Sequence, residues 1–126
     1  MTIKVEKEEQ YILVTPEEKM LDEKEVEQLE DKLIAHLEDG RVNLILNLSN
    51  VETVSDDFYY LADKIYNILL KEEGIMVITE APEQVIAKLA EYPLVITPTQ
   101  DEAVDYIFME ELEKQLREED KDPLWE

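Results

Sequence analysis

The sequence contains no cysteine, only two glycines and a single histidine. Without cysteine there can be no disulfide, no thiolate zinc site, no iron-sulfur cluster and no cysteine nucleophile. Loops that cradle phosphate groups need several glycines, so Gly40 and Gly74 leave no Walker or Rossmann fingerprint. His36 has no second histidine with which to share a metal ion, and its position in an expected helix indicates a flank residue. We therefore expect no enzymatic activity, no cofactor and no metal ion.

Basic residues are also scarce, since 12 Lys and Arg stand against 33 Asp and Glu, for a formal net charge of −21. Such a surface repels nucleic-acid phosphates and anionic bilayers, so we expect no nucleic-acid partner. No apolar run is long enough to span a membrane, and the N-terminus lacks the apolar stretch of a signal peptide. The sequence predicts a cytoplasmic protein without direct membrane insertion, whose partner carries a basic surface.

The apolar pattern alternates between strand-like and helix-like segments. Short β-prone runs predict strands at 3–5, 11–15, 42–48, 75–79 and 94–97, the first two forming an antiparallel pair. Helical spacing predicts four helices. The first covers about 23–39, and the second begins near Asp56. The third has Pro82 in its first turn, and the fourth follows a capping box formed by Thr99 and Glu102. Gly40 and Gly74 follow the first two helices, where a left-handed C-terminal residue is favoured.

This order predicts an α/β fold, because strands separated by single helices need crossover connections. With 126 residues, we expect one domain, a mixed β-sheet of four to five strands packed against about four α-helices. We place this domain at residues 1–117 and a flexible acidic C-terminal tail at residues 118–126. Trp125 lies in that tail, and its role stays open.

The element order and the segment LILNLSNVETVSDDFYYLADKI resemble the STAS family, which includes the anti-sigma-factor antagonists, over about residues 3–112. In that family a buried strand ends in a pattern like L-D-L-S-x-V, and an apolar pair and D-S-S-G-L follow at a helix start. Leu46, Asn47, Leu48, Ser49 and Val51 match the first pattern. The late segment TPTQDEAVDYI is similar to the start of the family's final helix. The resemblance implies a single STAS-like domain.

The sequence differs from the family pattern at the helix start, where Ser55 to Tyr59 align with D-S-S-G-L. The resemblance places Asp56 at the position of the phosphoacceptor serine, and a shift of one residue would place Ser55 there as the second choice. An aspartate cannot accept phosphate from a serine kinase, but it is a partial phosphomimetic, because it holds a fixed charge where a phosphoserine carries about −1.5 to −2. The helix dipole stabilises such a carboxylate by about 0.3–1 kcal/mol. Alternatively, Ser55 is an N-cap, and Asp56 and Asp57 are favoured by the dipole alone.

A second candidate contact lies along the same helix, where Tyr59, Tyr66 and Leu70 recur beside the apolar face. We expect these side chains to be partly exposed, and tyrosine suits a protein interface. The alternative is that they pack against a neighbouring helix or a sheet edge. The predicted partner-binding residues are Ser55, Asp56, Asp57, Tyr59 and Tyr66.

The resemblance implies partner switching, in which a non-catalytic module binds an anti-sigma factor, usually a kinase of the GHKL type, and so releases a sigma factor. With Asp56 in place, the chain is expected to be either a constitutively weak binder or a scaffold whose partner prefers an acidic loop. The alternative function is a STAS-type accessory or scaffold subunit of a transporter or larger regulatory assembly.

Overall fold

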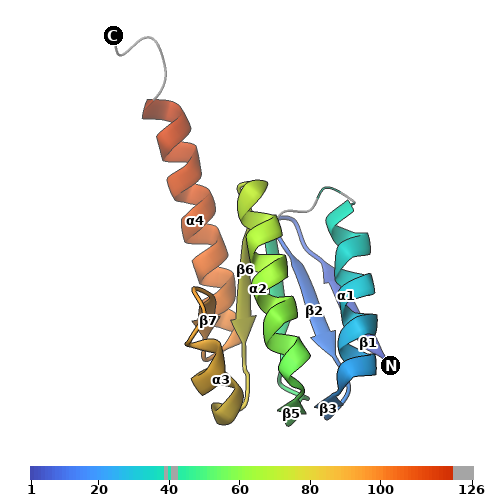
Figure 1. The fold of residues 1–126 in the computed structure, drawn as a ribbon. Helices are drawn as coiled ribbons and strands as arrows, with labels where there is room; N and C mark the ends of the chain where they lie inside the picture. The colour runs from blue at the N-terminus through green and yellow to red at the C-terminus, as the bar shows by residue number, and fades with distance from the viewer. Residues whose placement is uncertain (39, 41–42, 121–126) are drawn as a thin grey trace.

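The computed structural model describes residues 1–38, 40 and 43–120, and they form a five-stranded mixed sheet with helices on both faces (Figure 1). The strands lie in the order β1 (Ile3–Lys7), β2 (Ile12–Pro16), β4 (Asn43–Asn47), β6 (Ile75–Thr79) and β7 (Val95–Thr97). β1 is antiparallel to β2, and all other neighbours are parallel. The predicted α/β fold and its N-terminal antiparallel pair are confirmed.

Within the described residues, three helices connect these strands, α1 (Glu23–Glu38), α2 (Asp56–Lys71) and α3 (Glu83–Leu89), and α4 (Gln100–Asp120) follows the last strand. Pro82 is the N-cap of α3 and does not occupy its first turn, which corrects the prediction by one position. Since α4 continues through Asp120, residues 118–120 of the expected tail belong to a helix. The remainder of that tail, 121–126 with Trp125, lies outside the described residues, as do position 39 of the first predicted helix and position 42 of the third predicted strand.

Each central strand alternates its side chains between two cores, as the pleat of a strand requires. One face of the sheet packs against α1, α2 and α3. The opposite face packs against α4 alone, with Ala103 and Ile107 buried on Leu13, Ile45 and Val77. The strand residues buried on the three-helix face are Ile12, Val14, Leu44, Leu46, Met76 and Ile78. The sheet therefore separates α4 from the start of α2, whereas the C-terminal end of α2 lies beside α4, where Leu70 and Glu110 line one cavity.

The ends of the first two helices differ in their use of glycine. Gly40 has a φ of 87°, so the predicted left-handed residue after α1 is confirmed. After α2 the left-handed residue is Glu73, with a φ of 60°, and the prediction for Gly74 is wrong. Glu73 N donates to Leu70 O and Gly74 N donates to Leu69 O, which is the hydrogen-bond pattern of a Schellman motif. A glutamate therefore holds a conformation that glycine adopts with less strain.

A small second sheet joins two segments that lie outside the predicted strands and helices. β3 (Met20–Leu21) pairs in parallel with β5 (Thr53–Val54). In addition, Glu52 N donates to Lys19 O, and Ser55 N donates to Leu21 O at 2.8 Å. These bonds attach the segment that leads into α2 to the segment that leads into α1.

Candidate functional site

The candidate site begins at the carboxyl end of β4, where the chain turns toward α2. Asn47 is 5% exposed, and its Oδ1 accepts a hydrogen bond of 2.8 Å from Ser49 N. Its Nδ2 donates to Gln100 Oε1 at 2.8 Å. Leu48 N donates to Thr79 O of β6, and Val51 is buried. The turn is thus tied at its start to the sheet and at its end to the small β3–β5 sheet.

Ser55 is the N-cap residue of α2, with extended backbone angles and its carbonyl oxygen accepting from Phe58 N at 3.1 Å. The predicted N-cap position is confirmed. The side chain, however, makes no capping hydrogen bond. Its Oγ is buried and has no hydrogen-bond partner among the described residues. The Ser55 side chain therefore satisfies none of the free amides of the first turn.

Asp56 and Asp57 occupy the first turn of α2, and both are exposed. The Asp56 side chain is 81% exposed, and its Oδ1 accepts a hydrogen bond of 2.8 Å from Lys88 Nζ of α3. That hydrogen bond raises the pKa of Lys88 and keeps the ammonium group charged. The anion at the helix start is thus exposed to solvent and held against one cation.

Tyr59 is 6% exposed, so the prediction that it lies partly exposed on the flank of α2 is wrong. Its ring stacks on Tyr92, with centroids 6.5 Å apart and an interplanar angle of 4°, and meets the edge of Phe58 at 5.8 Å. Lys88 Nζ lies 4.9 Å from the ring centroid, within cation–π range. Burial raises the pKa of Tyr59, and Lys88 opposes part of that shift. Tyr59 therefore supports the helix start from beneath.

The exposed aromatic side chain of this region is Tyr60, which is 68% exposed and is not among the predicted partner-binding residues. Tyr66 is partly buried and packs against the core, and Leu70 is 47% exposed, so partial exposure is confirmed for both. We name the exposed side chains of Asp56, Asp57 and Tyr60 the acidic α2 surface.

An open groove of about 420 Å³ between α1 and α2 adjoins this surface, because Asp57 and Tyr60 form one of its walls. Three glutamates of α1 form the other wall, and Lys64 of α2 forms an ion pair with one of them, Glu30. The three are Glu23, Glu27 and Glu30. From the sequence, helical periodicity identifies these glutamates only as part of a solvated face of α1. That they lie opposite Asp57 follows from the packing of α1 against α2, which the sequence pattern does not contain.

The chemistry open to these residues is ionic binding. Exposed carboxylates such as those of Asp56 and Asp57 accept charge-assisted hydrogen bonds from the Lys and Arg side chains of a partner. Within the part of the chain that is described, no three His, Asp or Glu side chains are arranged to hold a metal ion. None of its helices is both long and apolar enough to cross a membrane.

Comparison with known proteins places this geometry in a structural class. No family model and no curated protein matches the sequence. The structure is similar to that of the anti-sigma factor antagonist SpoIIAA in its unphosphorylated form, with a TM-score of 0.70, 17% identity, and 84% of this chain and 97% of SpoIIAA covered. It is also similar to an anti-sigma-factor antagonist (STAS) domain protein from Planctomyces limnophilus, with a TM-score of 0.72, 19% identity, and coverage of 83% and 96%.

A third similar structure is the murine anion transporter Slc26a9 in its inward-facing state. The TM-score is 0.66 at 18% identity, and the match covers 79% of this chain and 18% of the transporter. The chain therefore has the fold of STAS-domain anti-sigma-factor antagonists, as the resemblance of its sequence predicts. That fold also occurs as a small part of a much larger membrane protein.

Proposed function

We propose that this protein is a non-catalytic cytoplasmic regulator that binds an anti-sigma factor, or a related kinase-like regulator, through the acidic α2 surface. The observation that carries the proposal is the position of Asp56. Its side chain is 81% exposed in the first turn of α2, at the place that the STAS resemblance gives to the phosphoacceptor serine. A fixed charge at that place binds a partner without any covalent step.

The partner in this proposal presents Lys and Arg side chains. The groove between α1 and α2 continues the negative charge of Asp56 and Asp57 toward Glu23 and Glu27. Opposite charge steers encounter and accelerates association, and salt screens it over about 8–10 Å at moderate ionic strength. The net charge of −21 extends this attraction over the whole molecule. Of the two behaviours that the sequence leaves open, we therefore favour a scaffold whose partner prefers an acidic loop.

Phosphorylation is not part of the proposed mechanism. Ser55 is the nearest serine, and its Oγ is buried at the N-cap, so a kinase would have to open the turn before it could reach the hydroxyl. Intact-mass spectrometry after incubation with the kinase-like partner and ATP is expected to find no added phosphate. Phosphate on Ser55 would show that a covalent switch persists one residue before Asp56.

The decisive experiment measures the affinity of purified anti-sigma factors, encoded in the same genome, for the wild-type chain and for Asp56→Ser. We expect Asp56→Ser to weaken binding at least about tenfold, which corresponds to ~1.4 kcal/mol. The matched control is Asp105→Ser, which removes an exposed carboxylate from α4 on the other face of the sheet. Equal affinity of all three proteins, or no binding of any anti-sigma factor, would overturn the proposal.

The similarity to part of Slc26a9 favours one alternative, a STAS-type accessory or scaffold subunit of a transporter or larger assembly. This alternative predicts stable co-purification with a membrane complex in detergent. It also predicts that anti-sigma factors do not bind the purified chain, so the same titration separates the two functions.

A further inference from the structure

Helix α4 is longer than the sheet face that it covers. Its 21 residues extend about 32 Å at 1.5 Å per residue, whereas a five-residue strand such as β6 spans about 17 Å. Its only buried apolar residues are Ala103 and Ile107, both in the N-terminal half. The C-terminal half therefore extends beyond the strands, away from α3 (Figure 1).

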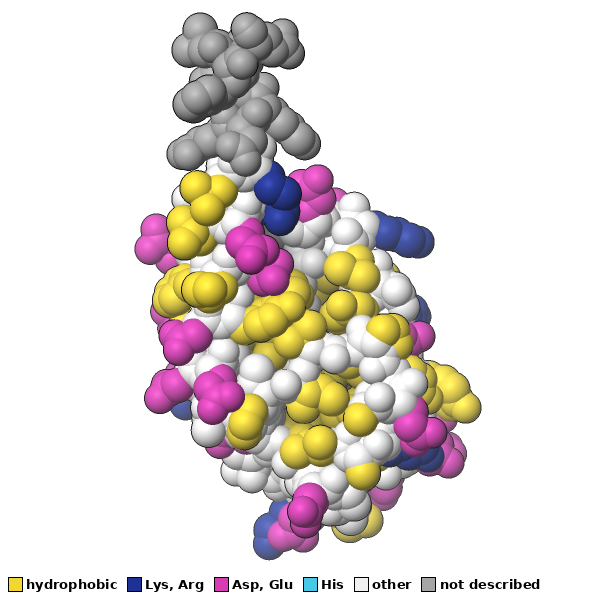
Figure 2. All heavy atoms as spheres, turned by 90° about the vertical axis from the view of Figure 1, so that its left-hand side faces the viewer, with side chains coloured by type: hydrophobic (Ala, Val, Ile, Leu, Met, Phe, Trp, Pro, Cys, Tyr) yellow, Lys and Arg dark blue, Asp and Glu magenta, His cyan; other side chains and the backbone are white. Residues whose placement is uncertain are grey.

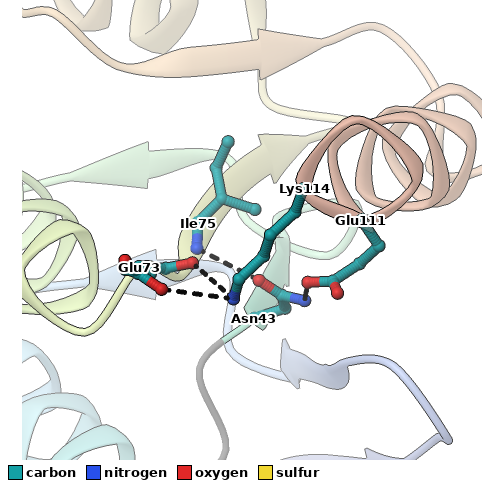
Figure 3. Close-up of polar contacts among 5 residues, drawn as sticks. All are labelled: Asn43, Glu73, Ile75, Glu111 and Lys114. Carbon is teal, nitrogen blue, oxygen red and sulfur yellow. Dashed lines mark hydrogen bonds and ion pairs between the residues drawn. The ribbon is translucent and has the colours of Figure 1, made fainter. Parts of the chain in front are cut away.

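Two polar contacts fix the rotation of this extended half (Figure 3). Asn43 at the start of β4 donates from Nδ2 to Glu111 Oε1 at 2.8 Å, and its Oδ1 accepts from Ile75 N at 3.2 Å. Lys114 Nζ lies 3.9 Å from Glu73 Oε2 and donates to Glu73 O. Asn43 is 5% exposed, so its amide anchors α4 from within the protein. Glu111 and Lys114 thus define the inner side of the helix.

An apolar stripe runs along the outer side of α4. Phe108, Leu112 and Leu116 follow one another at intervals of four residues and are 48%, 52% and 50% exposed. Met109, at 61%, lies beside them. At about 100° per residue, Leu112 lies opposite Ala103, the residue that faces the sheet. We name these four side chains the α4 outer stripe, and Figure 2 shows hydrophobic side chains along α4 with acidic ones between them.

The stripe contributes little to the stability of the chain, because its side chains stay half exposed in the folded state. Single exposed apolar side chains are common, but a contiguous patch with a polar rim is typical of a protein interface. The rim here is acidic, since Asp105 and Glu113 are exposed on the same side of α4. The two basic residues of this helix, Lys114 and Arg117, pair with Glu73 and Glu113. A partner of this surface must therefore combine an apolar face with positive charge.

We propose that the α4 outer stripe binds a basic amphipathic helix of a partner protein. Apolar residues spaced by three and four positions on that helix would pack against Phe108, Leu112 and Leu116, and its Lys and Arg would pair with flanking acids such as Glu113. A second copy of this chain fits less well, because both copies carry a net charge of −21.

The inferred surface is independent of the proposed function, because the sheet separates α4 from the acidic α2 surface. One partner can occupy α2 while another occupies α4. The chain would then act as an adaptor that holds two proteins on opposite faces of one sheet.

Fluorescence anisotropy with a labelled peptide tests this inference on the full chain. The probe has about 18 residues, five helical turns, with leucines along one face and lysines elsewhere. A second peptide has the same residues in an order that leaves no apolar face. We expect the amphipathic peptide to bind at least tenfold more tightly than its scrambled control.

Two double variants locate the binding. Phe108→Ser with Leu112→Ser removes the centre of the stripe and is expected to weaken peptide binding at least tenfold. Met20→Ser with Tyr60→Ser removes two exposed apolar side chains, one from β3 and one from α2, and is expected to change it less than twofold. All four side chains are substantially exposed, and circular dichroism checks that both variants fold.

Equal binding of the two peptides would overturn the inference, because charge alone would then explain it. A loss of equal size in both double variants would overturn it as well. The inference would also be overturned if the free wild-type chain sediments as a dimer and the variant Phe108→Ser with Leu112→Ser sediments as a monomer. A second copy of the chain would then occupy the stripe.

Discussion

Lys88 joins the start of α2 to α3, because its Nζ lies 2.8 Å from Asp56 Oδ1 and 4.9 Å from the centroid of the Tyr59 ring. Beneath it, Tyr59 stacks on Tyr92, which follows α3. The charge of Asp56 is therefore fixed in place by a residue 32 positions further along the chain. Lys88 also lowers the negative potential that an approaching partner meets, so it is expected to moderate binding at the acidic α2 surface.

The first prediction concerns Lys88→Met. We expect this variant to associate faster with a basic partner, because Asp56 loses its neighbouring cation, and to show a steeper decrease of the rate with salt. Stability should hardly change, since an exposed ion pair contributes little. Stopped-flow measurement of the association rate at several salt concentrations checks this.

Lys4→Met is the matched control for that measurement. It removes the same charge from another exposed ion pair, in which Lys4 Nζ lies 3.4 Å from Glu6 Oε1 on the edge strand β1. If both substitutions accelerate association equally, net charge alone sets the rate, and Lys88 does not moderate Asp56.

The second prediction concerns stability at alkaline pH. Burial raises the pKa of Tyr59 above its ordinary value of about 10, so the folded state binds its proton more tightly than the unfolded state. The resulting stabilisation is complete below about pH 10 and is lost as pH rises through the folded-state pKa. The free energy of unfolding, measured by urea denaturation, should therefore decrease less between about pH 9 and pH 11.5 for Tyr59→Phe than for the wild type.

Burial also raises the pKa of Tyr11 and Tyr106, so the variant is expected to remove only part of the wild-type dependence. Tyr60→Phe, at a residue that is 68% exposed, is the control and should follow the wild-type curve. Parallel curves for Tyr59→Phe and the wild type would contradict the burial argument.

The main elements could be predicted because each carries its own local signal. The short β-prone runs of β4 and β6 and the helical spacing in α1, α2 and α4 depend only on neighbouring residues. Gly40 could be placed in the left-handed region because it follows a periodic segment directly. The resemblance at the strand-to-helix segment then added the STAS-like domain, which periodicity alone does not contain.

Other features depend on residues far apart in sequence, and local patterns do not contain them. β3 and β5 have two residues each, too few for any periodicity, and exist because they pair with one another. Tyr59 lies on the flank of its helix by spacing, but Tyr92 covers it after the chain has passed through β6 and α3. The same holds for the contact of Lys88 with Asp56. The candidate site was therefore located by sequence, while its electrostatic balance required the structure.

The third prediction concerns the strained end of α2. Glu73 has a φ of 60°, a conformation that costs a residue other than glycine about 1–2 kcal/mol. Glycine removes this strain but adds about 0.4–1 kcal/mol of backbone entropy to the unfolded state. Glu73→Gly should therefore raise the free energy of unfolding by about 0.5 kcal/mol in urea denaturation.

Glu72→Gly is the adjacent control, because Glu72 has a φ of −97° and no left-handed strain to relieve. We expect this variant to lower the free energy of unfolding by about 0.5–1 kcal/mol. If both substitutions destabilise equally, the conformation of Glu73 is not strained.

The fourth prediction concerns Glu80, which caps α4 from another part of the chain. Glu80 Oε2 accepts a hydrogen bond of 3.0 Å from Gln100 N, the first amide of α4, and lies 3.5 Å from Asn47 Nδ2. A carboxylate at a helix N-terminus both satisfies a free amide and interacts favourably with the helix dipole. Glu80→Ala should therefore lower the free energy of unfolding by about 1–2 kcal/mol.

Two comparisons separate the cap from other effects of the substitution. Glu80→Gln keeps an acceptor oxygen and the same backbone conformation, with a φ of 55°, so its loss should be smaller than that of Glu80→Ala. Glu91→Ala removes an exposed carboxylate without a capping role and should change stability by less than about 0.5 kcal/mol. Hydrogen exchange should accelerate at Gln100 in Glu80→Ala, since its amide loses the acceptor. If Glu80→Ala proves as stable as the wild type, the start of α4 does not depend on this carboxylate.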